Sequence, residues 1–498
     1  MSMTHPAANR NSEIQQKLAD TLAFLQEAFE QRTALQDVER GVWKRLLEMG
    51  RLCLTHLLER HGSADLGPSI TLPSGEVCQR LDALHSRRYV SIFGVFQLQR
   101  TVYGSREGQK QELVPLDNRL QLPSSDFSYL LQDWDQNLCV EQAFGQVQSV
   151  VARILELKQP VDSLEQMNRA MAQDASRYIL NRPLPAAQEE GALAVGSVDG
   201  KGIVLRRDAQ TPAPPVHRTK GEKASKKRMA TVGTMYTVDR YVRTPEEVLA
   251  ALFRDGPAAA APRPQPQHKQ VWASLPQEDG SLSGQAAVFT WLDYELRRRN
   301  PGQAKETIYL CDGQDALWCD VRDCLPAANS HWILDILHVT PRIWRAAHVF
   351  YSEGSKEAET FVRQRVLLVL QGKATSVIRG LRALATRRGL TASKKKAVRA
   401  ICNYLTKNLE RMRYHEYLAA GYPIASGVIE GACRHLVKDR MERAGMHWTA
   451  SGAQAMLDLR SIFVSGQWEA YQAYRIARET QRLYPHREAA EPNFSMAS

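Results

Sequence analysis

The hydrophobic positions of the first 180 residues predict mainly helices. Apolar residues recur at helical spacing through residues 12–60, beginning with Ile14, Leu18, Leu22, Leu25 and Phe29. Ser12 and Gln15 fit a capping box at the start of this helix. Residues 87–103 instead alternate and are rich in β-branched and aromatic types, which predicts a β-hairpin. Helical stretches follow at about 126–139, 141–157 and 162–180, and they suit either a helix-turn-helix-like unit or a plain helical bundle.

The pattern changes to that of a sheet after residue 190. The predicted elements are, in order, a strand and a second strand within 191–207, a strand at 230–238, a helix at 283–299, a strand at 307–311, a helix to about Leu325 and a strand at 331–335. Short connections allow the first three strands to be antiparallel, whereas strands separated by helices are expected to be parallel. This order predicts a mixed five-stranded α/β sheet, which is the ribonuclease H-like arrangement.

The rest of the chain is predicted to be helical, apart from a Pro/Ala-rich linker at 256–267. The fold expected is a ribonuclease H-like core with an all-helical insertion and a mainly helical N-terminal region. The domains expected are an N-terminal helical region (1–66), a β-hairpin module (67–125), a helical region that suits a helix-turn-helix (126–185), the first part of the core (186–340), a basic helical insertion (341–424), the second part of the core (425–465) and a tail (466–498).

The composition is that of a globular protein. The chain has 498 residues, or about three domains at roughly 150 residues each. Its 43% hydrophobic and 24% charged residues exclude disorder along the whole chain. Eight scattered cysteines without a Cys-x-x-Cys pair favour reduced thiols over a disulfide or zinc framework. The N-terminus lacks the apolar core of a signal peptide, and runs such as Val366–Leu370 are too short to span a bilayer. We therefore expect a cytoplasmic protein with no membrane partner.

The charge is positive. Lys and Arg number 65 against 54 Asp and Glu, which gives a formal net charge of +11. This excess fits a polyanionic partner, although basicity alone would fit a membrane surface equally well.

Two strands of the predicted sheet end in an Asp-Gly pair, Asp199-Gly200 and Asp312-Gly313. A glycine beside the carboxylate leaves room for a bulky anionic backbone. The first and fourth strands are neighbours in the ribonuclease H-like arrangement, so Asp199 and Asp312 should lie side by side. Adjacent carboxylates need protons or divalent cations between them, and hard oxygen ligands suit Mg²⁺ or Mn²⁺. Two such ions can stabilise the attacking and leaving oxygens of a displacement at phosphorus.

A third acid is expected from a late helix at 427–445. Its apolar stripe would pack on the sheet, and it consists of Val428, Ala432 and Leu436 with Ile429, Cys433 and Val437. Gly445 would follow the helix as its C′ residue. Glu430, Arg434 and Lys438 recur every four residues on another face, as an acid for a metal and two bases for a nucleic-acid backbone. Taken singly, Asp-Gly is usually a turn and a Glu-Arg pair four residues apart is usually a surface ion pair. Their joint placement favours a site for phosphoryl transfer.

Four segments of the chain resemble the characteristic blocks of DDE transposases from bacterial insertion sequences. They are SVDGKG, YLCDGQDALW, WILDILHVTPRIW and YPIASGVIEGACRHLVKDRMERAGMHW, and they are most similar to the Kra-type family, which is related to the Mutator-like and hAT-like enzymes. The resemblance implies Mg²⁺-dependent cleavage and transfer of DNA strands, with Asp199, Asp312 and Glu430 as the catalytic, metal-binding acids and two ions per site. Relatives often carry a cysteine-rich module after the hairpin. Residues 102–117 contain no cysteine, so the resemblance does not extend to a zinc site there.

The resemblance also covers two residues beyond the three acids. Asp335 and His338 match the C/D-x-x-H signature that follows the second acid in Mutator-like enzymes. Asp335 is therefore the alternative second metal ligand. His338 would orient or contact DNA, or pack in the core.

Positive charge concentrates in two segments. Residues 371–400 hold nine Lys or Arg and no acid, and such a run repels itself unless an anion is bound. The loop 218–228, RTKGEKASKKR, is the second basic segment. The residues expected to contact DNA are Lys201, Lys223, Lys226, Lys227, Arg228, Arg387, Arg388, Lys394, Lys395, Lys396, Arg434, Lys438 and Trp448, the last by stacking on a flipped base.

The function expected is that of a transposase. It would bind the terminal inverted repeats of its element and target double-stranded DNA, as a homodimer or larger synaptic complex because two ends must meet. Two alternatives stay open: a ribonuclease H-like nuclease that cuts without joining, and an inactive DNA-binding protein descended from a transposase. Strand transfer from pre-cleaved ends separates them.

Overall fold

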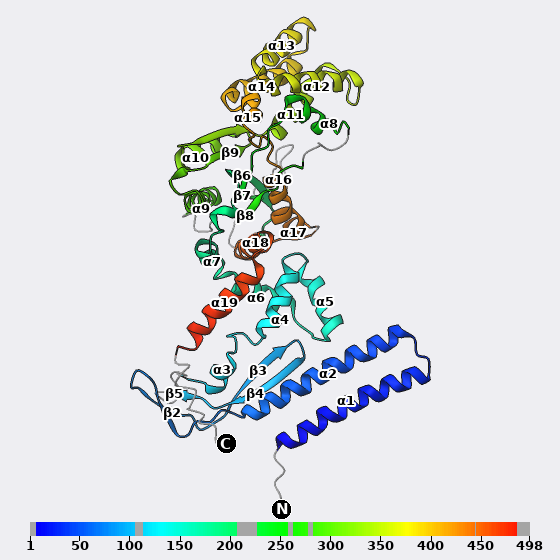
Figure 1. The fold of residues 1–498 in the computed structure, drawn as a ribbon, viewed down its shortest axis with the longest axis vertical. Helices are drawn as coiled ribbons and strands as arrows, with labels where there is room; N and C mark the ends of the chain where they lie inside the picture. The colour runs from blue at the N-terminus through cyan, green and yellow to red at the C-terminus, as the bar shows by residue number, and fades with distance from the viewer. Residues whose placement is uncertain are drawn as a thin grey trace, which may run out of the picture. The chain divides into compact units, whose positions relative to one another are not determined.

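A computed structural model of the chain describes residues 6–104, 113–206, 227–256, 262–276, 282–443 and 445–485. It divides into two compact units (Figure 1). The smaller unit joins Met1–Asp174 to Trp468–Ser498, and the larger unit is Ala175–Gln467. In the described residues, none of the helices combines the length and hydrophobicity that a bilayer crossing requires.

A mixed five-stranded sheet forms the centre of the larger unit. Its strands are β6 (Leu193–Ile203), β7 (Arg228–Val238), β8 (Gln267–Ser274), β9 (Glu306–Cys311) and β10 (Ser330–Leu334), in the order β10-β9-β6-β7-β8. β6, β7 and β8 pair antiparallel, whereas β9 is parallel to β6 and β10 is parallel to β9. The predicted mixed sheet of five strands is confirmed, as is the pairing of its first and fourth strands.

Two of the early strands differ from the prediction. Residues 191–207 were expected to form two strands, but β6 is continuous because it stays paired with β7 through the Asp-Gly pair as far as Ile203. The third antiparallel strand is β8, which directly follows the Pro-rich segment and was missed. Its residues QHKQVWAS are half polar because most of them are only partly buried, so they lack the apolar signature of a strand. α8 (Pro245–Phe253) lies between β7 and β8.

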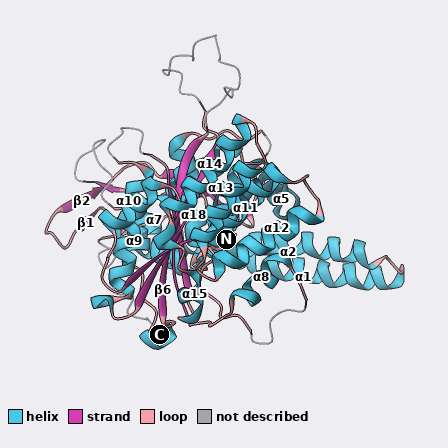
Figure 2. Ribbon diagram, turned by 90° about the horizontal axis from the view of Figure 1, so that it is seen from above, coloured by secondary structure: helices cyan, strands magenta, loops and turns pink. Residues whose placement is uncertain are grey.

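Helices cover both faces of the sheet (Figure 2). α9 (Gly284–Arg299) packs closely on one face, where a Cβ on Gly196 or Gly233 would meet Leu292 or Val288. α10 (Asp315–Cys324) connects β9 to β10, and α18 (Ala450–Val464) packs on β8. α7 (Ala175–Asn181) contacts α18. The opposite face carries the residues of the candidate site.

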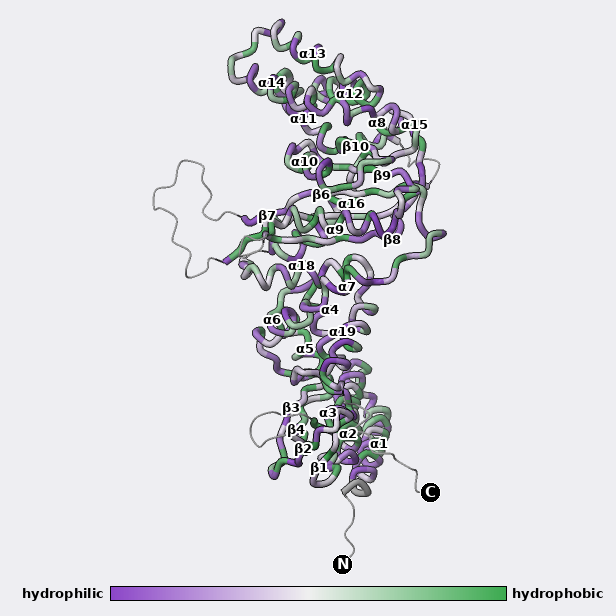
Figure 3. Tube along the Cα trace, turned by 90° about the vertical axis from the view of Figure 1, so that its left-hand side faces the viewer, coloured by the Kyte–Doolittle hydropathy of each residue, from purple (hydrophilic) through white to green (hydrophobic). Residues whose placement is uncertain are grey.

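A helical segment follows β10. It consists of α11 (Ile336–Phe350), α12 (Lys356–Leu370), α13 (Ala374–Arg387), α14 (Ala392–Lys407) and α15 (Tyr414–Ala419). Its apolar residues share one core with the sheet, in which Ile308 and Ile333 belong to the same cluster as Val366 and Leu405. Hydrophilic and hydrophobic residues alternate along α13 and α14 (Figure 3), as expected for helices with one buried face.

The late helix is α-helical at first and then widens. α16 (Gly427–Ala432) continues as a π-helix (Cys433–Lys438) and a short turn α17 (Asp439–Met441). Its buried residues come in pairs four apart: 432 and 433, 436 and 437, 440 and 441. A period of four drifts around an α-helix of 3.6 residues per turn, and the wider π-turn cancels this drift. The helix ends at Met441 rather than at 445, so Gly445, at φ +77°, lies in the following loop.

The smaller unit begins with two antiparallel helices, α1 (Pro6–Glu30) and α2 (Leu35–His61). The single predicted start at Ser12 is wrong, because α1 begins six residues earlier and Ser12 lies inside it. The predicted hairpin is confirmed as β3 (His85–Ser91) and β4 (Gly94–Arg100). The remaining elements are β1 (Ser69–Thr71), β2 (Val77–Arg80), β5 (Tyr103–Gly104), α3 (Pro115–Leu120), α4 (Tyr129–Cys139), α5 (Phe144–Leu155) and α6 (Val161–Ala172).

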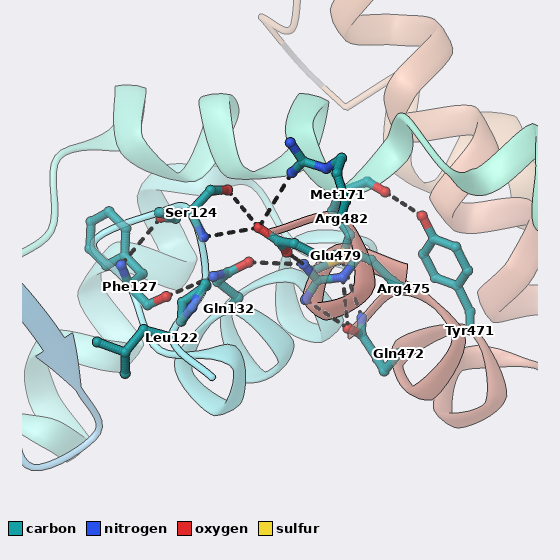
Figure 4. Close-up of polar contacts among 12 residues, drawn as sticks. Leu122, Ser124, Phe127, Gln132, Met171, Tyr471, Gln472, Arg475, Glu479 and Arg482 are labelled. Atoms are coloured by element: carbon teal, nitrogen blue, oxygen red, sulfur yellow. Dashed lines mark hydrogen bonds and ion pairs between the residues drawn. The ribbon is translucent and has the colours of Figure 1, made fainter. Parts of the chain in front are cut away.

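The last helix, α19 (Trp468–Leu483), belongs to the smaller unit. Figure 4 shows its polar contacts with this unit. Buried Arg475 donates to Gln132 Oε1 at 3.1 Å, and Glu479 Oε1 accepts from the backbone N–H of Ser124 at 3.0 Å. The Tyr471 hydroxyl donates to the carbonyl of Met171. The chain therefore leaves the smaller unit, forms the larger one and returns.

Candidate metal centre

Three aspartates lie at one level of neighbouring parallel strands, Asp199 inside β6 and Asp312 and Asp335 directly after β9 and β10. The pairing of β6 with β9 ends at Gly196 opposite Tyr309, and the same register continued by three residues brings Asp199 opposite Asp312. Cys311 pairs with Leu334, so Asp312 and Asp335 are the next positions of β9 and β10. Residues at one level of parallel strands point to the same face, with strands about 4.8 Å apart. Asp199 was predicted to end its strand; it lies inside β6, at the point where β6 no longer pairs with β9.

Electrostatics agree with this arrangement. The pKa of the Cys311 thiol is raised to about 12, mainly by burial and also by the charges of Asp312, Asp199 and Asp335, while a backbone hydrogen bond with Val198 opposes the shift. The charges of all three carboxylates therefore act on one buried thiol, as expected if the three lie close together.

Asp335 is fully buried and heavily hydrogen-bonded. Its Oδ1 accepts from the backbone N–H of Leu337 at 2.8 Å, which caps α11, and from the N–H of Ser426 at 3.3 Å. Its Oδ2 accepts from the Ser426 hydroxyl and lies 3.1 Å from His338 Nδ1. This carboxylate therefore ties the start of α11 to the residue that precedes α16.

His338 lies between two acids. Its Nδ1 faces Asp335, and its Nε2 is 3.8 Å from Glu430 Oε1. The hydrogen bond with Asp335 raises the pKa of His338 above its ordinary value; burial opposes this, and the charges of Asp335, Asp312 and Asp199 add to it. The ring is therefore protonated over a wider pH range than a free histidine.

α16 brings Glu430 to this group of residues. One turn further along, the Cys433 thiol donates to Asp199 Oδ2 over 3.6 Å, so this helix faces the end of β6 that carries Asp199. Burial raises the pKa of Cys433, and the charge of Asp199 is the second cause. Neither Cys433 nor Ser426 was singled out for the site. Cys433 was visible only as a member of the apolar stripe, and Ser426 only as the residue before the helix.

The donor set suits a divalent cation. Asp335, His338 and Glu430 each offer a ligand atom within 4.8 Å of one another. Asp199 and Asp312 each accept one hydrogen bond from the local backbone on Oδ1, from Gly200 and Gln314 respectively, both at 2.7 Å. In the described part of the chain, Oδ2 of Asp312 has no hydrogen-bond or ion-pair partner. Carboxylate oxygens with free lone pairs are the ligands that Mg²⁺ or Mn²⁺ takes.

The two glycines have neighbours that leave little room for a side chain. A Cβ on Gly313 would lie 2.4 Å from the ring of Tyr404 on α14, and one on Gly200 would lie 3.0 Å from Met229 Cε. Neither glycine has a positive φ. The packing of the Tyr404 ring therefore leaves room only for glycine at position 313, independently of any ligand.

The predicted DNA contacts near the sheet differ in their surroundings. Lys227 forms an ion pair with Glu442 at 2.5 Å, Arg434 lies 3.7 Å from Asp439, and Arg228 is exposed at the start of β7. Lys201 is partly exposed in β6, and Lys438 is exposed on the π-helix with Arg434, one element after Glu430 of α16. Lys223 and Lys226 lie outside the described residues.

Trp448 is largely buried. Its backbone bridges to the segment after β6, and its indole N–H donates to the carbonyl of Met441 at 3.3 Å. The guanidinium of Arg440 lies 4.8 Å from the ring centroid. This ring has 8% of its surface exposed, which leaves little for stacking on a base.

The predicted basic run forms one face of the α13–α14 hairpin. All nine of its Lys and Arg residues are exposed, and within the described residues none forms an ion pair. Lys394, Lys395 and Lys396 lie in the first turns of α14, where the helix dipole disfavours cations and favours anions. Arg387 ends α13, and Arg388 donates to the carbonyl of Phe350 at 2.7 Å.

Comparison with known proteins identifies no family for this chain. No family model and no curated protein matches the chain. Among solved structures, the Drosophila P element transposase strand transfer complex is similar at 10% identity and a TM-score of 0.24, over 76% of this chain and 86% of that chain.

Proposed function

We propose that this chain is a transposase of the DDE type, built on a ribonuclease H-like sheet. The observation that carries the proposal is the register of three parallel strands, which puts Asp199, Asp312 and Asp335 at one level, while α16 brings Glu430 within 4.8 Å of Asp335 and His338. The strand order β10-β9-β6-β7-β8, with its antiparallel first three strands, supports the ribonuclease H-like assignment.

The catalytic acids are Asp199, Asp312 and Glu430. Mg²⁺ ions held by them would polarise the scissile phosphodiester and stabilise the charge that develops on it. Asp312 is a better ligand than Asp335, because both oxygens of Asp335 already accept hydrogen bonds from the protein. Asp335 positions His338 and raises its pKa, which favours the protonated ring as a hydrogen-bond donor to a phosphate oxygen.

The α13–α14 basic face is the DNA-binding surface of this proposal. Unpaired cations at the start of a helix lower their own energy by binding phosphate, and neither helix offers an acid in its first turn. The DNA would be the terminal inverted repeats of a bacterial mobile element and its target. A homodimer or larger assembly would bring two ends together.

A strand-transfer assay tests the proposal. The full chain is mixed with pre-cleaved, labelled DNA ends, a target plasmid and Mg²⁺. Asp199→Asn, Asp312→Asn and Glu430→Gln should each lower the joined product by a factor of about 10³ or more, while DNA binding by gel shift persists. Glu357→Gln, an exposed acid on α12, is the matched control and should leave the joined product unchanged.

Other outcomes would assign a different function. Cutting without joining would make the chain a nuclease, and binding with neither activity would make it a DNA-binding protein. If Asp312→Asn keeps full activity and Asp335→Asn loses it, Asp335 rather than Asp312 is the second catalytic acid.

A further inference from the structure

Arg342 on α11 is a cation beside the candidate metal centre that the proposed function does not use. It follows His338 by four residues, and residues four apart share one face of an α-helix. On that face His338 lies between Asp335 and Glu430. The same face of α11 therefore carries Arg342, about 6 Å further along the helix axis.

The guanidinium of Arg342 stacks on the ring of Tyr404 from α14. Its Cζ lies 3.4 Å from the ring centroid, which makes this a direct cation–π contact. α11 packs against α14, and apolar residues of both helices belong to one buried core. The aromatic ring therefore fixes the orientation of a planar group whose donors already have a rigid arrangement.

The ring of Tyr404 also lies against the residue that follows the second acid. A Cβ on Gly313 would be 2.4 Å from the Tyr404 hydroxyl oxygen. Electrostatics agree with this placement: burial raises the pKa of Tyr404, the charge of Arg342 lowers it, and the charge of Asp312 raises it. Arg342 and the residue after Asp312 therefore contact the same aromatic ring.

The charge of Arg342 has no acidic partner in the described residues. Of the acids at the site, Asp335 and Glu430 face His338 instead. Nε of Arg342 is buried without a hydrogen-bond partner, whereas the side chain as a whole is partly exposed and accessible from solvent. A buried donor without an acceptor costs free energy, and an anion that binds the guanidinium would remove this cost.

Packing alone does not account for this arrangement. An apolar side chain at position 342 would also pack on Tyr404, and it would not bury an unsatisfied N–H. The basic face of α13 and α14 does not account for it either, because the Lys and Arg residues of that face are all exposed.

We infer that Arg342 binds a non-bridging oxygen of the phosphodiester on which the three acids act. The inference rests on the proposed function and deepens it, since it assigns a further residue to the same site. The planar fork of N–H donors of an arginine matches the geometry of a phosphate. Beside Asp312, its fixed charge would stabilise the negative charge that develops on the phosphate oxygens during the displacement. Tyr404 is a positioning residue, which holds the guanidinium in place.

A binding cycle measured by fluorescence anisotropy tests this contact. A labelled duplex with the end of the mobile element carries either an ordinary phosphate or an uncharged methylphosphonate at the cleavage position. Ca²⁺ replaces Mg²⁺, so that the carboxylates have an ion and the DNA stays intact. Arg342→Gln should bind the ordinary duplex about tenfold more weakly than wild type, and the methylphosphonate duplex as well as wild type does. Equal loss on both duplexes, or no loss on either, would overturn the inference.

The strand-transfer assay adds a rate. Arg342→Gln should lower the rate of joining by a factor of about 10² or more, because a fixed donor to the developing charge is lost. Arg342→Lys keeps the charge without the planar fork and should recover only part of this rate. The matched control is Arg345→Gln, an exposed cation on the same helix, which should behave as wild type in both measurements. A loss in Arg345→Gln as large as that in Arg342→Gln would mean a general effect of charge and would contradict the assignment.

Tyr404 is tested by the same binding cycle. Tyr404→Phe keeps the ring and should keep the difference between the two duplexes, whereas Tyr404→Leu should lose most of it. Loss in Tyr404→Phe as well would overturn the role assigned to the ring.

The outcomes separate this inference from the proposed function. A wild type that joins DNA, with Arg342→Gln showing no difference between the duplexes, leaves the transposase proposal intact and removes Arg342 from the site. A difference between the duplexes without any joined product supports the phosphate contact and makes the chain a nuclease or a DNA-binding protein.

Discussion

Asp335 accepts four hydrogen bonds inside the larger unit, and a single substitution can separate its roles. Asn at this position keeps the shape but replaces one acceptor by an NH₂ that faces donors. We expect Asp335→Asn to lower the free energy of unfolding by about 2–4 kcal/mol, because buried donors are left unsatisfied.

The same substitution should change the titration of His338. The carboxylate of Asp335 is the main cause of its raised pKa, so the pKa should fall in Asp335→Asn. NMR titration of the His338 ring in metal-free protein measures this. His331, whose pKa is lowered by burial and by the nearby Arg413 and Arg240 with no contribution from Asp335, is the internal reference and should not change. An unchanged pKa of His338 would mean that Asp335 does not hold its proton.

Asp458 on α18 makes stability depend on pH. Burial raises its pKa to about 7, although Trp272 and Gln454 donate hydrogen bonds to its Oδ1. The folded state therefore keeps a proton that the unfolded state releases near pH 4, and the stability present below pH 4 is lost as the pH rises to about 7. Asp458→Asn keeps the acceptor without the charge. Denaturant unfolding should find this variant more stable than wild type at pH 8, on the order of a few kcal/mol, and no more stable at pH 4.

At the scale of the element, replacement of two glycines by alanine should change stability in opposite directions, at Gly313 after β9 and at Gly380 in α13. Gly313→Ala should destabilise the larger unit by roughly 1–3 kcal/mol, since its Cβ would overlap the ring of Tyr404. Gly380 lies in α13 with nothing within 4 Å of a built Cβ. Gly380→Ala should stabilise by about 0.5–1 kcal/mol through its helix propensity. Chemical denaturation measures both, and equal effects would contradict the contact between Gly313 and α14.

The start of α14 should contribute to DNA affinity through charge alone. Replacing Lys394, Lys395 and Lys396 by Ala should weaken binding and reduce the slope of log K against log salt by up to about 2.7, or roughly 0.9 per lost phosphate contact. Fluorescence anisotropy at several salt concentrations gives the slope. Replacement of Arg413, Arg297 and Arg322, which pair with acids on exposed surfaces, is the control. A slope that does not change would remove α14 from the DNA path.

Elements were predictable where their signals are local. The apolar run before Asp199 is a strong local signal for a buried strand. Helical connections correctly predicted that β9 and β10 are parallel strands, although β8, which follows α8, pairs antiparallel with β7. The ribonuclease H-like order predicted that the strands that place Asp199 and Asp312 are neighbours. β8 was not predicted because a partly buried strand keeps polar residues such as Gln267 and Lys269, and the apolar pattern of a strand is then lost. The partners of Asp335 were not predictable, since Ser426 lies 91 residues away and meets it only through the fold.

At the scale of the molecule, the smaller unit depends on a helix from the far end of the chain. Arg475 is 5% exposed and lies between Gln132 and Glu479. Arg475→Ala should leave Glu479 without its buried cation and cost about 3 kcal/mol in the smaller unit. Hydrogen exchange should show lost protection in α4 with no change in β6 and β9. Arg482→Ala is the control, because Arg482 is mostly exposed. Uniform loss across both units would contradict this division.

The return of α19 also sets an order of events during synthesis. Ribosomes release the segment up to Asp174 first, but its final helix emerges only after the entire larger unit has been made. Nascent chains therefore carry an incomplete first unit, with the contact surface of Tyr471 and Arg475 open to solvent, for most of translation. Since the larger unit is one continuous segment, Ala175–Gln467, it can fold before the smaller unit has all of its residues. A ribosome that stalls before codon 468 would leave a polypeptide whose chemistry is assembled and whose N-terminal part is unfinished.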